Sequence, residues 1–241
     1  MSGHSRWHKV RQYKGGIDAK RATTFTKMAR AVTVAARLGG GNPDFNFSLR
    51  LAIDRAKSAS VPKDVIERAV KKGTGELEGG AITEAVYEAF GPGKVGIIIV
   101  CQTDNTNRSI TEIKNVVAKH DMTLAAQGAV SWNFEKKGVL YISADEVAKH
   151  VADEFELMLI EAGALDIIKT DEQWIVYTTV ADYGHTLKAL TTQNVSISDS
   201  AIEYVAKETK ELTSEQSSEL ETILEKLDDL DDVDAVFHNA G

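Results

Sequence analysis

The residues in this sequence whose types and spacing could do chemistry are cations gathered near the N-terminus. Residues 1–72 hold 16 Lys and Arg against 5 Asp and Glu, a net charge of +11, whereas residues 73–241 hold 12 against 31, a net charge of −19. Clustered Lys and Arg neutralise the phosphates of nucleic acid and release its condensed counterions. The N-terminal segment therefore predicts a nucleic-acid-binding surface in a chain whose formal net charge is only −8.

These cations fall into two groups. Residues 17–38 contain no proline or glycine, and at about 100° per residue their apolar side chains and their cations take opposite sides of a helix. Upstream, cations alternate with aromatic residues, of which Trp7 or Tyr13 could stack on an exposed base. The predicted nucleic-acid-binding residues are His4, Arg6, Trp7, Lys9, Arg11, Lys14, Lys20, Arg21, Lys27, Arg30, Arg37, Arg50 and Lys57.

Other reactive residue types do not form a recognisable active site. No set of nucleophile, base and orienting residue stands out, so we expect a non-enzymatic protein without a cofactor. His4 and His8 have the spacing of metal ligands on a helix, but no cysteine is near and no carboxylate precedes Asp18, so no metal site is predicted. Cys101 ends an apolar run and is expected in a buried strand.

The elements that must position the cations are helical. Residues 17–38 end at a run of three glycines, a strong helix stop. A second helix is expected over 46–59, and a third begins at Pro62 and closes at Lys71-Lys72-Gly73. Residues 1–75 therefore predict a small three-helix bundle, followed by a glycine-rich linker.

Beyond the linker the periodicity changes to that of strands. Strands are expected over 82–90 and 95–101, joined at Gly91-Pro92-Gly93-Lys94, which lacks the spacing and the Ser or Thr of a P-loop and predicts a hairpin turn. Asn105 to Asn107 supply caps for a helix, and residues 129–134 alternate like another strand.

From residue 138 a second α/β unit is expected, with the order βαββαβ. Its strand at 173–177, Gln-Trp-Ile-Val-Tyr, does not match the base-stacking signature of RNA-recognition domains, so Trp174 and Tyr177 are interpreted as core or edge residues. The remaining expected elements are strands at 139–143, 165–169, 174–179 and 201–206 and helices at 145–162 and 183–193.

The last forty residues provide one more helix and strand. Thr213 and Gln216 form a capping box, and residues 233–238 read as a strand. Since a lone helix and strand cannot form a domain, they are placed back on the 80–134 unit, completing a ββαβαβ sheet. The predicted fold class is α+β, an N-terminal three-helix domain followed by two ferredoxin-like α/β domains, one inserted in the other. The predicted bounds are 1–78, 79–135 plus 207–241, and 136–206.

An ordered set of motifs also runs from residue 3 to about 138. It starts at Gly3-His4-Ser5-Arg6-Trp7 and continues through Asp18-Ala19-Lys20-Arg21, Phe25-Thr26-Lys27, residues 35–44, Leu49-Arg50-Leu51-Ala52-Ile53, Pro62-Lys63-Asp64, Ile66-Glu67-Arg68-Ala69, Tyr87-Glu88, Gly91-Pro92-Gly93 and Thr103-Asp104-Asn105. This set resembles the YebC/PmpR family, which includes the mitochondrial translational activator of cytochrome c oxidase I. The closing Asp231-Asp232-Val233 and Phe237-His238-Asn239 also fit.

The resemblance implies a helical first domain and two α/β domains, one inserted in the other. It also implies a regulator, since bacterial members are described as DNA-binding transcriptional regulators and others act as translation factors at the ribosome. The chain departs from the family at Thr106, where an arginine is usual, and at Phe47-Ser48-Leu49-Arg50, where the family has Pro-Arg-Leu-Arg. Two potential cationic contacts are therefore missing.

The expected function is a non-enzymatic, nucleic-acid-binding regulator of gene expression, in the first place a DNA-binding transcriptional regulator. The alternative is a translation factor that binds the ribosome or its RNA and relieves stalling. A second alternative is a protein-interaction module acting through the acidic C-terminal domains, where residues 211–234 hold ten acids against Lys226. That alternative predicts that removing residues 1–75 leaves function largely intact.

The expected setting is a cytoplasmic monomer with no membrane partner. The longest apolar run, 95–101, is far too short to cross a bilayer. The N-terminus lacks the apolar core of a secretory signal, and its glycines and sparse apolar residues argue against a mitochondrial presequence. A single cysteine allows no intramolecular disulfide and suits a reducing compartment.

Overall fold

The computed structural model describes residues 19–77, 82–120 and 122–241, with side chains from Thr24 onward. The chain divides into two compact units, of which the second is Asn133–Lys207 and the first is the remainder. The predicted α+β class is confirmed. Within the described ranges, no helix is both long and apolar enough to cross a membrane.

The first unit starts with a helical part made of α2 (Ala19–Gly39), α3 (Phe47–Ser58) and α4 (Lys63–Gly73). Its small core consists of apolar side chains that recur at helical spacing on all three helices. Several of these residues are alanines. The buried members include Val32, Ala36, Leu49, Ala56, Ile66 and Ala69. This core fixes how the cations of the three helices are presented.

A sheet follows in the first unit, built from β1 (Thr83–Phe90), β2 (Gly96–Thr103), β3 (Thr123–Ala125) and β8 (Val233–His238). Its order is β3-β1-β2-β8 and every pairing is antiparallel. The predicted hairpin is confirmed, since Pro92–Lys94 joins β1 to β2. The C-terminal strand pairs with β2, as the predicted ββαβαβ sheet requires.

Two helices cover one face of that sheet, α5 (Thr106–Val117) and α9 (Ser214–Asp228). Alternate residues of β2, including Ile97, Ile99 and Cys101, meet Ile113 of α5 and the leucines of α9 in one fully buried core. The expectation that Cys101 is a core residue is confirmed. The capping box of Thr213 and Gln216 is present at the start of α9.

The second unit contains β4 (Phe134–Ser143), β5 (Asp166–Lys169), β6 (Gln173–Thr178) and β7 (Asp199–Ala206), in the order β5-β6-β4-β7. Its helices are α6 (Ala144–Val147), α7 (Ala152–Glu161) and α8 (Tyr183–Thr192). The order βαββαβ with this sheet arrangement is that of the ferredoxin-like fold. Trp174 and Tyr177 are buried, as interpreted from the sequence.

Two expected elements were wrong. The helix expected over 145–162 is two helices, because the chain turns after α6 so that the ring of His150 stacks on Phe155 at 4.3 Å between centroids. The strand expected over 129–134 is instead a turn and a short 3-10 helix at Ser131–Asn133. Its backbone donors bond to a side chain of β1, described below.

Candidate nucleic-acid interface

The predicted nucleic-acid-binding residues fall into three sets. Lys20 and Arg21 lie in the first turn of α2, but their side chains are outside the described part. Lys27, Arg30 and Arg37 lie on α2, and Arg50 and Lys57 lie on α3. His4, Arg6, Trp7, Lys9, Arg11 and Lys14, together with Tyr13, fall outside the described residues.

Lys27 and Arg30 form hydrogen bonds with the acidic end of α9 and with the residues that precede β8. The Lys27 ammonium donates to the carbonyl oxygen of Asp228 and lies 3.3 Å from its carboxylate. The Arg30 guanidinium donates to the carbonyl oxygen of Asp231 at 2.6 Å and to the Asp232 carboxylate at 2.7 Å. A phosphate could therefore reach these two cations only if these intramolecular contacts broke.

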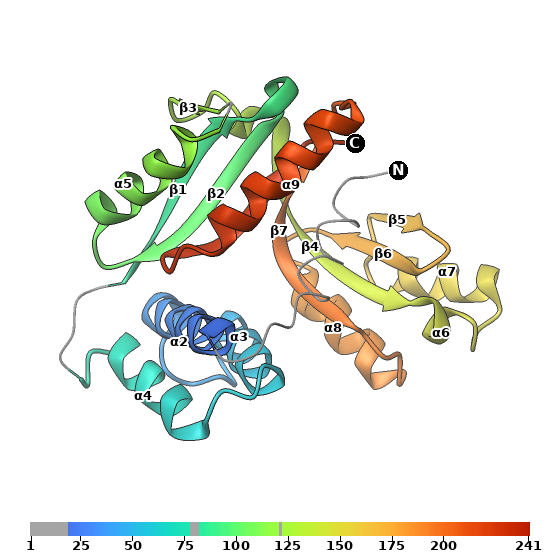
Figure 1. The fold of residues 1–241 in the computed structure, drawn as a ribbon. Coiled ribbons are helices and arrows are strands. Elements are labelled where there is room, and N and C mark those ends of the chain that lie inside the picture. Colours follow the sequence, from blue (N-terminus) through green and yellow to red (C-terminus); the bar gives the residue numbers. More distant parts are fainter. Residues whose placement is uncertain (1–18, 78–81, 121) are drawn as a thin grey trace. The chain divides into compact units, whose positions relative to one another are not determined.

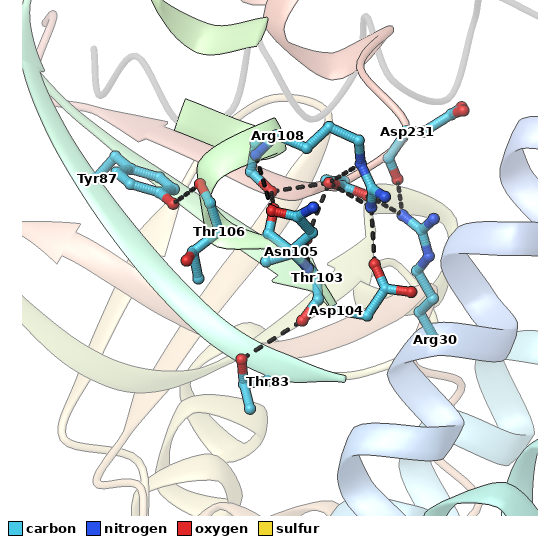
Figure 2. A network of polar contacts seen from close by, with 11 residues as sticks. Arg30, Thr83, Tyr87, Thr103, Asp104, Asn105, Thr106, Arg108 and Asp231 are labelled. Atoms are coloured by element: carbon cyan, nitrogen blue, oxygen red, sulfur yellow. Dashed lines mark hydrogen bonds and ion pairs between the residues drawn. The ribbon is translucent and has the colours of Figure 1, made fainter. Parts of the chain in front are cut away.

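The carboxylate of Asp232 is the centre of this network, and among its donors Arg30, Thr103 and Arg108 are labelled in Figure 2. Its side chain is only 2% exposed, yet it accepts hydrogen bonds from the hydroxyls of Thr103 and Ser109 at 2.9 and 2.7 Å. Arg108 donates to it through both Nε and Nη2, at 3.1 and 2.8 Å. A buried carboxylate is stable only when paired and hydrogen-bonded in this way.

Local sequence explains how these donors converge. Asn105 caps α5 by accepting from the backbone N–H of Arg108, which places Arg108 and Ser109 in the first turn. Asp104 then holds the outer side of the Arg108 guanidinium at 2.9 Å (Figure 2). The segment Thr103–Ser109 therefore binds the carboxylate of a distant residue, Asp232, which immediately precedes β8.

The pKa of Asp232 reflects these neighbours. Burial by itself raises it, but the hydrogen bonds from Arg108, Ser109 and Thr103 and the positive charge of Arg30 outweigh burial. The pKa of Asp232 is therefore held below its ordinary value of 3.8. The group is ionised throughout the physiological range and offers no proton for acid–base chemistry at neutral pH.

A second buried carboxylate organises the loop between β3 and β4. Glu88 of β1 is 5% exposed and accepts from the backbone N–H groups of Gly128 at 2.7 Å, Val130 at 2.6 Å and Ser131 at 3.0 Å. Burial raises the pKa of Glu88, but these three bonds prevail and lower it below 4.5. They also explain why residues 129–133 turn rather than continue as a strand.

Both carboxylates link stability to pH in the same direction. Because each pKa is lower in the folded chain than in the unfolded chain, the stability they contribute is complete above about pH 4.5. It is lost as the pH falls through the folded pKa values, which lie below 4.5 for Glu88 and below 3.8 for Asp232. Urea unfolding at pH 7 and pH 3 should therefore show a smaller acid-induced loss in an Asp232→Asn, Glu88→Gln double variant than in the parent. Equal losses would contradict this assignment.

Exposed cations gather instead where α2 and α4 end. Arg37 and Lys71 are exposed and Lys72 is half-buried. A Cβ on Gly73 would lie 2.6 Å from the Ala36 Cβ, so the end of α4 touches α2 beside Arg37. Within the part of the chain that the structure describes, none of the three cations has an ion pair, and the Arg37 guanidinium donates only a long hydrogen bond, 3.5 Å, to the carbonyl oxygen of Ile82. We call Arg37, Lys71 and Lys72 the terminal cationic cluster.

The two remaining predicted residues, Arg50 and Lys57, form exposed ion pairs. The guanidinium of Arg50 lies 3.7 Å from the Asp44 carboxylate and the ammonium of Lys57 lies 3.4 Å from that of Asp54, all with well-exposed side chains. Exposed pairs of this kind are worth about 0–1 kcal/mol, so a phosphate could displace the acid. Lys71 and Lys72 were not among the predicted nucleic-acid-binding residues. From the sequence they were interpreted only as the end of a helix, where lysines interact favourably with the helix dipole.

Comparison with known proteins gives one consistent result. Residues 5–76 match the family model described as the TACO1/YebC protein N-terminal domain, and residues 82–240 match that of the TACO1/YebC second and third domain. "Probable transcriptional regulatory protein FN1661" of Fusobacterium nucleatum is 41% identical over 99% of this chain and 95% of its own. A relative from Dehalococcoides mccartyi with the same description, DehaBAV1_0421, is 42% identical over 100% and 94%.

Among solved structures, the chain is similar to "Crystal Structure of a Conserved Hypothetical Protein Aq1575 from Aquifex Aeolicus". The TM-score is 0.84 at 37% sequence identity, covering 95% of this chain and 93% of that one. The agreement extends over the helical part and both sheets at once, since so little of either chain is left out.

Proposed function

Since this chain belongs to the TACO1/YebC family, we propose that it is a non-enzymatic regulator of gene expression that binds nucleic acid through its helical part. The observation that carries the proposal is the terminal cationic cluster, in which Arg37 and Lys71 are exposed and Lys72 is half-buried, on a segment of net charge +11. The first form of the proposal is a DNA-binding transcriptional regulator in the cytoplasm. The relatives named "Probable transcriptional regulatory protein" support this form.

The physical basis is phosphate neutralisation. Each cation that meets a phosphate releases condensed counterions, and the resulting affinity depends on salt. The acidic α9 cannot serve this purpose, because residues 211–234 hold ten acids against one base. The two oppositely charged parts therefore orient a nucleic acid toward α2–α4 and away from α9.

The alternative is a translation factor that binds ribosomal RNA. The exposed ring of Phe45, at 89% exposure beside the helical cations, favours it, because an aromatic side chain suits unpaired bases more than a duplex. The cationic cluster serves both forms of the proposal. Parallel binding to duplex DNA and to ribosomes separates them.

The test is a salt series with the full chain and a variant carrying Arg37→Ala, Lys71→Ala and Lys72→Ala. For duplex DNA the logarithm of affinity falls against the logarithm of salt concentration by about 0.9 per phosphate neutralised. The triple variant should therefore show a slope shallower by about 2.7, and weaker binding at low salt. Fluorescence anisotropy with a labelled duplex gives both quantities.

A matched control carries Lys114→Ala, Lys119→Ala and Lys188→Ala, three exposed lysines outside the helical part. It changes the net charge by the same amount and should keep the slope of the parent. A cluster variant with the parent's slope would refute the role of the cluster. Loss of slope in both variants would show that only the overall charge matters.

A further inference from the structure

One aromatic side chain of the helical part faces solvent almost completely. Phe45 is 89% exposed and lies in the turn between α2 and α3. Leu38, at the end of α2, is 81% exposed. Burying an aromatic ring removes about 150–250 Å² from water, so leaving it exposed forgoes a substantial stabilisation. Folding of the helical part alone does not account for a phenylalanine at this position.

The turn that carries Phe45 is firmly held by the next residue. Asn46 is buried, and its side-chain amide donates to the carbonyl oxygens of Ala35 at 2.7 Å and Gly40 at 2.8 Å. Its side-chain oxygen accepts from the backbone N–H of Leu49 at 3.0 Å and so caps α3. Phe45 is thus attached to a backbone that is fixed on both sides of the turn.

Arg50 secures the other half of the turn. Its guanidinium donates to the carbonyl oxygens of Pro43 at 3.0 Å and Asp44 at 3.1 Å. The same guanidinium lies 3.7 Å from the carboxylate of Asp44, the residue before Phe45, and offsets its negative charge. Because the backbone that carries the ring is held in advance, a ligand that stacks on Phe45 does not have to order the turn.

The turn lies at the same end of the helical part as the terminal cationic cluster. It starts at Gly40, three residues after Arg37, and a Cβ on Gly41 would lie 2.7 Å from the Thr74 Cγ2, just beyond Lys72 and Gly73. The turn that carries Phe45 and the three cations are therefore presented at the same end of the helical part. Stacking aromatics beside a cationic track are the usual means of holding a single strand.

We propose that Phe45 stacks on an unpaired base of a single-stranded nucleic acid whose phosphates meet Arg37, Lys71 and Lys72. The inference rests on the proposed function and adds the kind of strand that the surface takes. A membrane surface is a poorer fit, because one ring and one leucine do not make an apolar helix face. A duplex keeps its bases stacked on one another and leaves the ring without a partner.

The test compares a labelled single strand with a duplex of the same sequence, using the full chain and three variants. Phe45→Ala should weaken single-strand binding by about 5- to 150-fold. Phe45→Leu, which keeps apolar surface but has no ring, should bind nearly as weakly as Phe45→Ala. Phe45→Trp, which keeps an aromatic ring, should bind about as tightly as the parent. The salt slope should not change in any of them, because no phosphate contact is lost. Duplex binding should also be unaffected.

Thermal unfolding supplies the control, since replacing an 89% exposed side chain should leave the melting temperature unchanged. If Phe45→Ala binds like the parent while the cationic-cluster variant is impaired, the stacking inference is wrong and the proposed function stands. If Phe45→Leu binds like the parent and Phe45→Ala does not, the contact is aliphatic and stacking is again refuted. If the parent binds neither strand nor duplex, the proposed function itself fails.

Discussion

Replacing Asp232 with alanine is expected to lower the free energy of unfolding by about 3–5 kcal/mol, the range seen when one partner of a buried ion pair is removed. The substitution removes the acceptor of the Thr103 hydroxyl, leaves the Ser109 hydroxyl with only the carbonyl oxygen of Asn105, and removes the carboxylate from two arginines. Arg108 keeps Asp104 and Arg30 keeps the carbonyl oxygen of Asp231, so neither is wholly unpaired. The lost hydrogen bonds from the Thr103 and Ser109 hydroxyls and the lost carboxylate charge therefore account for most of the decrease in the free energy of unfolding.

Asp231 provides the matched control one residue away. Its backbone carbonyl accepts from Arg30, and the substitution Asp231→Ala keeps that carbonyl. Its side chain is exposed, so the change should stay within about 0.5 kcal/mol. Urea unfolding followed by circular dichroism measures both variants. A loss below about 1 kcal/mol for Asp232→Ala would show that the network is not the stabilising feature inferred here.

Glu88→Ala is expected to have the second largest effect, about 3 kcal/mol, because hydrogen bonds to a charged group are worth about 1.5–3 kcal/mol each and some of the freed N–H groups will reach water. Glu88→Gln keeps one acceptor oxygen but loses the charge, and should cost roughly half as much. The backbone N–H groups of Gly128, Val130 and Ser131 should exchange with deuterium faster in both variants.

Glu84 is the matched control for the second prediction. It lies four residues before Glu88 on the same face of β1, and it is exposed. Glu84→Gln should change stability by less than about 1 kcal/mol and leave exchange in the loop unchanged. Unaltered exchange at Gly128 and Val130 in Glu88→Ala would mean that the loop is held by something other than the carboxylate.

Elements whose signals are local were predictable from the sequence. The capping box of Thr213 and Gln216 marked the start of α9, and the alternation over 233–238 gave β8 to the residue. Asn105 marked the start of α5 because its side chain bonds to a backbone N–H three residues on. Each of these depends on contacts between residues close in the sequence.

Features that depend on distant residues were not predictable. The periodicity of α2 placed Lys27 and Arg30 on a polar face, but not the aspartates that meet them about 200 residues later in the chain. The strand expected over 129–134 failed because Glu88, some forty residues earlier, bonds to the N–H groups that a strand would have used. The closeness of Arg37 to Lys71 and Lys72 likewise follows from the packing of α4 on α2.

Strand β2, labelled in Figure 1, pairs with β8, and this pairing has a consequence for the order in which the protein can fold during synthesis. All of β2 is buried in the finished sheet, yet its partner strand is made only after the whole second unit. At about 5–20 residues per second, β2 would wait roughly 7–26 seconds on the ribosome with one edge unpaired. An open apolar edge recruits other strands, so the interval before Val233–His238 emerges is when a nascent chain is most exposed to aggregation.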